Sequence, residues 1–276
     1  MSNPLLNDRV FEGASRRSAG EAGWAAPERA SGASTWAPPV TDGPVSAWTP
    51  AGAVMTARGA MSATLMLAVV MVAAAVVGWG QVATAADGTV ALPGWLFAAA
   101  IGGMVAALVA TFKPAWARVL APVYAVLQGL VVGAISKVYN VAYDGIVLQA
   151  VGATLGVFLV MLALYRTRVL RVTSTFRRVV VGATLGIMAF YLVAIVASFF
   201  GAELVPSGSG LFSIGFSVVV AAIAAFNLAL DFDFIEQAER AGAPKHMEWF
   251  AALGLLVTIV WLYLEILRLL AKLRDR

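Results

Sequence analysis

Seven stretches of this chain are apolar over about 18 to 20 consecutive residues, the length that a helix needs to cross the hydrocarbon core of a membrane. They lie near residues 61–79, 94–112, 118–136, 146–165, 179–200, 210–231 and 249–270. The stretches are uniformly apolar, without the alternation of a membrane barrel, and the whole chain is 61% hydrophobic and only 12% charged. The sequence therefore predicts an all-α integral membrane protein, a seven-transmembrane-helix bundle.

The basic residues of the short connections indicate how the bundle is oriented. Lysine and arginine gather in the second, fourth and sixth connections, as Lys113, Arg118, Arg166, Arg168, Arg171, Arg177, Arg178, Arg240 and Lys245. Because basic loops stay in the cytoplasm, these connections and the N-terminus are predicted to be cytoplasmic. Seven full spans would then place the basic end of the chain outside. The last segment is accordingly either a full span or a re-entrant one that is tucked into the bundle.

The first 57 residues differ in composition from the rest of the chain. They are rich in proline, alanine, glycine and serine, and they contain no long apolar run. Such a composition cannot bury a core, so residues 1–57 are predicted to be a disordered cytoplasmic tail that precedes a membrane domain at 58–276. Three tryptophans recur every twelve residues in this tail, at Trp24, Trp36 and Trp48. Their side chains suit a partner protein or the headgroup layer.

Glycine pairs spaced four residues apart predict where helices pack closely. The pairs are Gly129 with Gly133, Gly152 with Gly156, and Gly182 with Gly186. Small residues at this spacing let two helix backbones approach each other in lipid. The last two pairs belong to copies of the same hexapeptide, VGATLG, at 151–156 and 181–186. This repetition fits either an inverted repeat or the reuse of a packing motif.

Acidic residues in the last two apolar segments are the main functional candidates. Asp231, Asp233 and Glu265 fall where an ionised carboxylate costs several kcal/mol unless it faces a partner or water. On a helix, Asn227 shares a face with Asp231, whereas Asp233 points about 200° away from Asp231. Glu265 is predicted to pair with Arg268, three residues later. The two aspartates also fit a simpler interpretation, in which they mark the polar end of the sixth span.

Two segments carry a resemblance to a known family. The segments NLALDFDFIE (227–236) and WLYLEILRLL (261–270), with the seven-span layout, resemble the Bax inhibitor-1/YccA family, the transmembrane Bax-inhibitor-motif proteins. Over about residues 55–276 the chain is most similar to the actinobacterial branch with a long N-terminal tail. The resemblance implies a pH-sensitive calcium leak channel in the bacterial cell membrane, gated by a hydrogen-bonded pair of acids. It places one acid at Asp231 or Asp233 and the other at Glu265, where a glutamate replaces an aspartate.

A simple hairpin does not bring these acids together. If the sixth helix ends at Asp231 and the last begins at Trp249, Glu265 lies about 24 Å along the last helix, at 1.5 Å per residue. A direct pair requires the sixth helix to continue past Asp231, or the last helix to begin after Trp249.

Carboxylate oxygens suit a hard cation, so Asp231 and Glu265 are the candidate ligands of a transported calcium ion. The resemblance also implies a supporting arginine that competes with calcium, for which Arg268 is the first candidate and Arg118 the second. Besides lipid, we expect calcium or protons as partners, and neither a further cofactor nor nucleic acid.

Catalysis is not expected from this sequence. It has no cysteine and one histidine, and it lacks the hydrolase, metalloprotease and phosphate-loop motifs. The alternative to a channel is a membrane regulator without transport activity. Such a protein would bind another membrane protein, for example a quality-control protease, through its tail and its glycine-lined helices.

Overall fold

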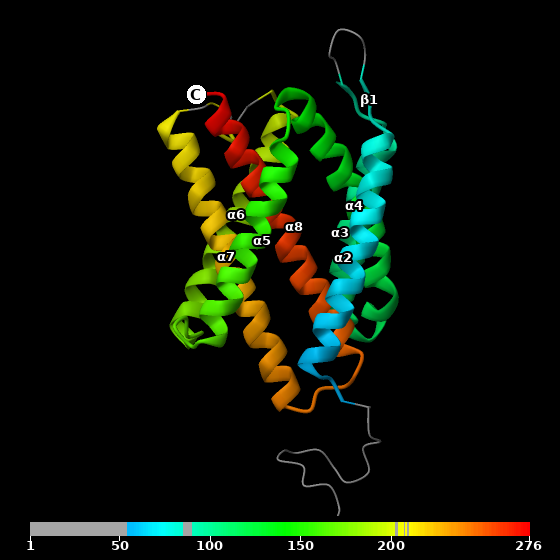
Figure 1. The fold of residues 1–276 in the computed structure, drawn as a ribbon, viewed down its shortest axis with the longest axis vertical. Coiled ribbons are helices and arrows are strands. Elements are labelled where there is room, and N and C mark those ends of the chain that lie inside the picture. Colours follow the sequence, from blue (N-terminus) through cyan, green and yellow to red (C-terminus); the bar gives the residue numbers. More distant parts are fainter. Residues whose placement is uncertain (1–53, 85–89, 202–203, 207, 209) are drawn as a thin grey trace, which may run out of the picture. The chain divides into compact units, whose positions relative to one another are not determined.

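The computed structural model describes residues 54–84, 90–201, 204–206, 208 and 210–276. In these residues seven helices are long and apolar enough to cross a membrane, which confirms the predicted helical bundle. They are α2 (Ala57–Gly80), α3 (Trp95–Phe112), α4 (Ala117–Ala142), α5 (Ile146–Arg166), α6 (Ser174–Ser198), α7 (Leu211–Arg240) and α8 (Met247–Arg274). A short hairpin of β1 (Ala83–Thr84) and β2 (Val90–Ala91) joins α2 to α3, and the 3-10 turn η1 (Pro114–Trp116) precedes α4 (Figure 1).

Most of the predicted tail, with its spaced tryptophans, lies outside the described residues. Its last few residues are packed against the bundle. Met55 is buried, and its N–H donates to the carbonyl of Ala243 at 2.7 Å. Thr56 caps the start of α2, and the Glu248 carboxylate accepts hydrogen bonds from both the N–H and the hydroxyl of Thr56. The connection between α7 and α8 and the first turn of α8 therefore fix the residues that precede α2.

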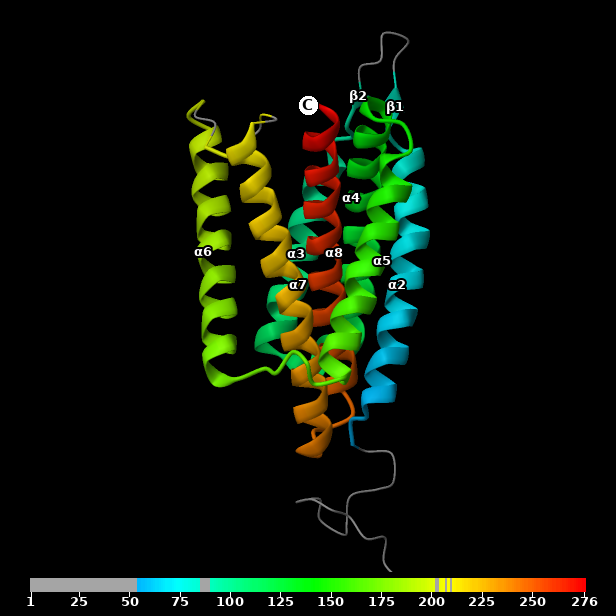
Figure 2. The same cartoon turned by 60° about the vertical axis from the view of Figure 1, so that its left-hand side comes forward.

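The helix α8 forms the centre of the bundle. It contacts α2, α4, α5 and α7, and 67% of its membrane-length window is buried, compared with 11% for α6. Figure 2 shows α6 at the edge of the bundle, next to α7. The 28 residues of α8 form one continuous helix, which agrees with the full span and not with the re-entrant alternative.

The helix that contains the sixth predicted span, near residues 210–231, is longer than the span itself. Instead of stopping near residue 231, α7 continues to Arg240. Hydropathy marks where the hydrocarbon ends, whereas a helix continues as long as its backbone hydrogen bonds and side chains allow. The additional turns are charged, with Asp233, Glu236, Glu239 and Arg240, and this composition is compatible with a helix that emerges from the membrane.

Glycine permits the close contact between α2 and α4. A Cβ atom added to Gly133 would lie 1.9 Å from the carbonyl oxygen of Ala75, and one on Gly129 would lie 2.5 Å from the carbonyl oxygen of Met71. Neither distance is sterically tolerable. The predicted packing role of the Gly129 and Gly133 pair is therefore confirmed.

The other two glycine pairs do not pack as predicted. Cβ atoms added to Gly152, Gly156, Gly182 and Gly186 would meet no atom within 4 Å in the described part of the chain. Both pairs lie on α5 and α6, whose membrane windows are only 22% and 11% buried. The hexapeptide repeat therefore forms no close helix contact within the described residues, because these faces point away from the other helices.

The two kinds of glycine make a matched pair for mutation. Gly133→Ala should lower the thermal stability of the detergent-solubilised protein by the equivalent of about 3 kcal/mol, because α2 and α4 must move apart to admit the methyl group. Gly186→Ala should leave stability unchanged or raise it by up to about 1 kcal/mol, through the better helix propensity of alanine. Thermal unfolding followed by tryptophan fluorescence measures both. Equal effects of the two substitutions would contradict the assigned α2–α4 contact.

Candidate functional site

Asp231 lies where α7 packs against α8. Its Oδ1 atom is 4.0 Å from the position that a Cβ on Gly254 would occupy, and its polar neighbour on α8 is the hydroxyl of Thr258. The other oxygen, Oδ2, is buried and has no hydrogen-bond partner among the described residues. An ionised carboxylate in such a place costs several kcal/mol, so we expect the Asp231 side chain either to hold a proton or to bind a cation.

Asn227 and Asp231 line the same cavity, as their spacing predicts. The cavity has a volume of about 410 Å³, and its other polar linings are Arg177 and Gln237. The Asn227 amide donates to the Thr184 hydroxyl on α6 at 2.8 Å. Asn227 therefore links α6 to the helix that carries Asp231.

Asp233 faces a different environment from Asp231. It forms an ion pair with Arg177 of α6, with 2.5 Å between the charged atoms, and it accepts a hydrogen bond from Gln237 at 2.6 Å. Asp233 therefore already has a cationic partner. Of the two aspartates that compete for the membrane site, Asp231 is the one that forms no ion pair within the described residues.

Glu265 belongs to a second cluster, between α8 and α6. Its side chain is almost fully buried, and Oε1 accepts from Arg268 at 2.8 Å and from the Tyr191 hydroxyl at 3.0 Å. Arg268 also donates to the Tyr191 hydroxyl at 2.6 Å. The predicted pairing of Glu265 with Arg268 is thus confirmed. The second oxygen, Oε2, is buried and has no partner in the part of the chain that the structure describes.

The two acids that the resemblance pairs belong to separate clusters, with no hydrogen bond between them among the described residues. Thr258, beside Asp231, precedes Glu265 by seven residues, or about 10 Å along α8. The hairpin estimate of about 24 Å is therefore too long. The cause is the extension of α7, which moves Asp231 away from the end of its helix and toward the middle of α8.

Arg118 does not join either cluster. It is exposed at the start of α4 and forms no ion pair with a described residue. The described residues also hold no group of three or more histidine, cysteine, aspartate or glutamate side chains placed to bind a metal ion. A calcium site at Asp231 and Glu265 stays a prediction, and its ligands would have to include hydroxyl, carbonyl or water oxygens.

Lys272 extends the polar groups to the far end of α8. Its side chain is buried, and Nζ donates to the Pro206 carbonyl at 2.8 Å, the Ser217 hydroxyl at 2.9 Å and the Ser213 carbonyl at 3.3 Å. One face of α8 carries Thr258, Glu265, Arg268 and Lys272, which we call the polar stripe of α8. From Thr258 to Lys272 the stripe rises through 14 residue steps, or about 21 Å of a hydrocarbon core that is about 30 Å thick.

Sequence reasoning missed three members of these clusters. In the sequence, Arg177 is only one of several basic residues in the fourth connection. Lys272 follows Arg268 by four residues, so helical spacing could have placed it on the same face. Tyr191 had no sequence signal, because only the folded bundle brings α6 next to α8.

The fold and the clusters define a class: a multi-pass membrane protein with seven spans and ionisable groups in its interior. A family model described as Bax inhibitor 1 like matches residues 3–275. The chain therefore belongs to the Bax inhibitor 1 like family. No curated protein and no solved structure matches it significantly.

A double-mutant cycle tests the cluster of Glu265. Arg268→Gln should destabilise the protein by about 3–5 kcal/mol, because it leaves a buried carboxylate without its partner. The double variant Glu265→Gln/Arg268→Gln should recover most of this loss. The exposed pair Glu236 and Arg240 provides the control, and Arg240→Gln should cost no more than about 1 kcal/mol. Thermal unfolding in detergent gives all values, and strictly additive losses would contradict a coupled buried pair.

Proposed function

We propose that the chain is a pH-sensitive calcium leak channel of the bacterial cell membrane, with its arginine-rich connections and its N-terminus in the cytoplasm. The observation that carries this proposal is the polar stripe of α8 together with Asp231. These groups form a series across the bundle interior, where purely structural helices would bury apolar side chains. Ionisable residues at membrane depth are typical of ion and proton pathways. The role is transport and not catalysis.

Asp231 is the proposed gate. When protonated, its side chain is neutral and compatible with the packed contact between α7 and α8. When ionised, it requires a cation or water, and Oδ2, which has no partner among the described residues, is available to either. Loss of the proton therefore favours a hydrated, cation-accepting state. The flux of calcium should rise as the pH rises.

Glu265 continues the pathway, and the basic residues limit it. Arg268 neutralises one oxygen of Glu265 and leaves Oε2 as a ligand for a passing cation. Lys272 places a second positive charge near the outer end of α8, where its ammonium group occupies three oxygen acceptors that would also suit a metal cation. The two charges would slow the entry of cations, as expected for a leak with low conductance.

Liposomes that contain a calcium-sensitive dye test the gate. The purified protein should release calcium into the dye compartment at pH 8 and progressively less toward pH 5, by at most about tenfold per pH unit for a single proton. Asp231→Asn should give low flux at every pH, because the amide resembles the protonated acid. The exposed loop acid Asp144 provides the control, and Asp144→Asn should retain the pH profile. An absence of flux between pH 5 and 8 would exclude the channel.

A second flux experiment tests the outer end of the pathway. Lys272→Met should raise calcium flux at pH 8 severalfold, because it removes a fixed positive charge from the path. Lys137→Met removes a charge near the same end of the bundle but outside the stripe, and it should have little effect. The double variant Asp231→Asn/Lys272→Met should return to low flux. Persistent high flux in the double variant would mean that the two residues do not share a pathway.

The open glycine faces of α5 and α6 favour a second candidate function. Gly152, Gly156, Gly182 and Gly186 present small residues at helix-packing spacing without a contact inside the described chain. A membrane regulator would use these faces to bind another membrane protein, such as a quality-control protease. The flux experiment separates the two functions. If deletion of residues 1–50 abolished the capture of such a partner without changing flux, the regulator would be supported.

A further inference from the structure

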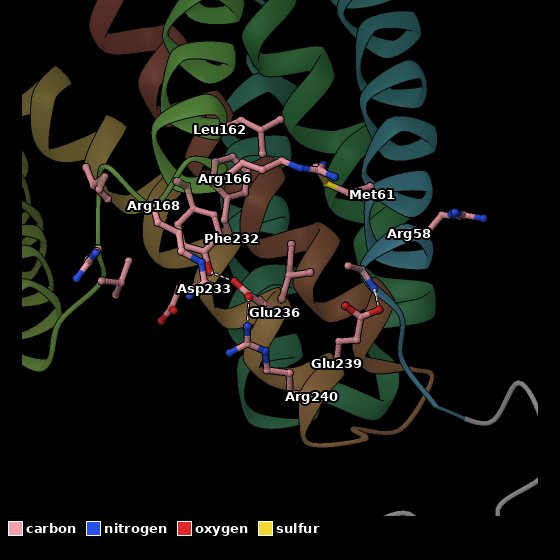
Figure 3. A pocket seen from close by; sticks show the side chains of 16 residues that line it. Arg58, Met61, Leu162, Arg166, Arg168, Phe232, Asp233, Glu236, Glu239 and Arg240 are labelled. Atoms are coloured by element: carbon pink, nitrogen blue, oxygen red, sulfur yellow. Dashed lines mark hydrogen bonds and ion pairs between the residues drawn. The ribbon is translucent and has the colours of Figure 1, made fainter. Parts of the chain in front are cut away.

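A large pocket opens at the end of the bundle where α2 begins and α5 ends. Its volume is about 900 Å³, and it is lined by α2, by the end of α5 with the connection to α6, and by the extended part of α7. Figure 3 shows Arg166 extending across the pocket toward Met61 of α2. None of the proposed pathway groups, Asp231, Glu265 or the polar stripe of α8, lines this pocket.

Arginine dominates the polar lining of the pocket. The lining contains Arg58, Arg166, Arg168, Arg171 and Arg240, against three acidic residues. Arg166, Arg168 and Arg171 come from one short stretch of chain and are all exposed. Guanidinium groups present planar, paired donors that match a phosphate group. The residue types therefore favour a phosphate-bearing anion over a cation.

The acidic residues of the pocket already have hydrogen-bond partners. Glu236 accepts hydrogen bonds from the Tyr165 hydroxyl and from Arg240. Glu239 accepts the backbone N–H of Ala57 at 2.9 Å, at the start of α2. The dashed lines of Figure 3 include these contacts around Glu236 and Glu239.

The third acid, Asp233, is paired with Arg177 of α6. Among the described residues, no carboxylate forms a salt bridge with Arg166, Arg168 or Arg171. Three arginines of the lining, Arg166, Arg168 and Arg171, therefore have no acidic partner in the described chain.

The inner wall of the pocket is apolar. Met61, Leu162, Phe232 and Ile235 line it, and each lies on a helix that continues into the membrane. A soluble phosphate ester would leave this surface without a matching group. A ligand with a phosphate head and an apolar chain would match both walls, because basic pockets at the cytoplasmic side of membrane helices suit anionic lipid headgroups.

We propose that this pocket binds the phosphate headgroup of an anionic membrane lipid. Arg166, Arg168 and Arg171 supply the positive charge that attracts the phosphate, and the acyl chain lies against the apolar wall. The site does not depend on the proposed transport function, because it uses none of the pathway residues.

The backbone at Arg168 gives an independent way to test the site. Its φ angle is 58°, a left-handed conformation that glycine adopts more easily than any other residue. Arg168→Gly therefore removes a guanidinium group while it relieves the backbone. This variant should bind lipid several times more weakly without any loss of thermal stability, so that unfolding cannot explain the weaker binding.

The main experiment is a titration of the detergent-solubilised full chain with dioctanoyl phosphatidic acid, with bound lipid counted by native mass spectrometry. Wild type should bind one molecule saturably, and dioctanoyl phosphatidylcholine should bind at least tenfold more weakly. The variant Arg166→Gln/Arg168→Gln/Arg171→Gln should bind phosphatidic acid at least tenfold more weakly than wild type. The control Lys113→Gln/Arg178→Gln/Lys245→Gln removes the same charge outside the pocket and should bind like wild type.

Three results would overturn the proposal. Equal losses in the two triple variants would indicate diffuse electrostatic attraction instead of a site. Equal binding of phosphatidic acid and phosphatidylcholine would show that the phosphate charge is not recognised. Displacement of the lipid by inorganic phosphate at a similar concentration would show that the apolar wall contributes nothing, so that the ligand is not a lipid.

Discussion

The polar stripe of α8 is the constraint on which the arrangement of the other helices depends. Lipid offers neither hydrogen bonds nor counter-charges, so a helix that carries Glu265, Arg268 and Lys272 can lie only in the interior of the bundle. The surrounding helices accordingly supply the partners. Tyr191 from α6 contacts both Glu265 and Arg268, and Ser217 from α7 accepts a hydrogen bond from Lys272. In this way α6, which is mostly exposed, is joined to the centre of the bundle.

The extended α7 connects the two proposed sites. Asp231 faces α8, whereas the next two residues, Phe232 and Asp233, line the arginine-rich pocket. A lipid in the pocket and a cation beside Asp231 would therefore contact the same turn of one helix. The start of α2 is held by Glu239 of this helix and by Glu248 at the beginning of α8. The entry of the chain, the pocket and the buried acid thus share one structural element.

The chain belongs to the Bax inhibitor 1 like family, and the two acids of its interior lie in separate clusters. In place of one pair of acids, there are an aspartate beside the hydroxyl of Thr258 and a glutamate in a cluster with Arg268 and Tyr191. Each cluster retains one buried carboxylate oxygen without a partner among the described residues. The α8 neighbours of Asp231, Gly254 and Thr258, precede Glu265 by about 16 and 10 Å along the helix, a spacing that fits two separate sites better than a single shared proton.

The sequence by itself determined the seven-span bundle, the Glu265–Arg268 pair and the face shared by Asn227 and Asp231, because hydropathy and helical spacing act within one segment. Only the tertiary structure decided which helices meet. It showed that α7 continues to Arg240, that the glycines of α5 and α6 form no close helix contact in the described chain, and that Tyr191 reaches α8. The physical reason is that a span has an apolar surface on nearly all sides. Its pattern identifies a membrane helix but does not specify its neighbours, which depend on the shape and polar groups of several helices at once.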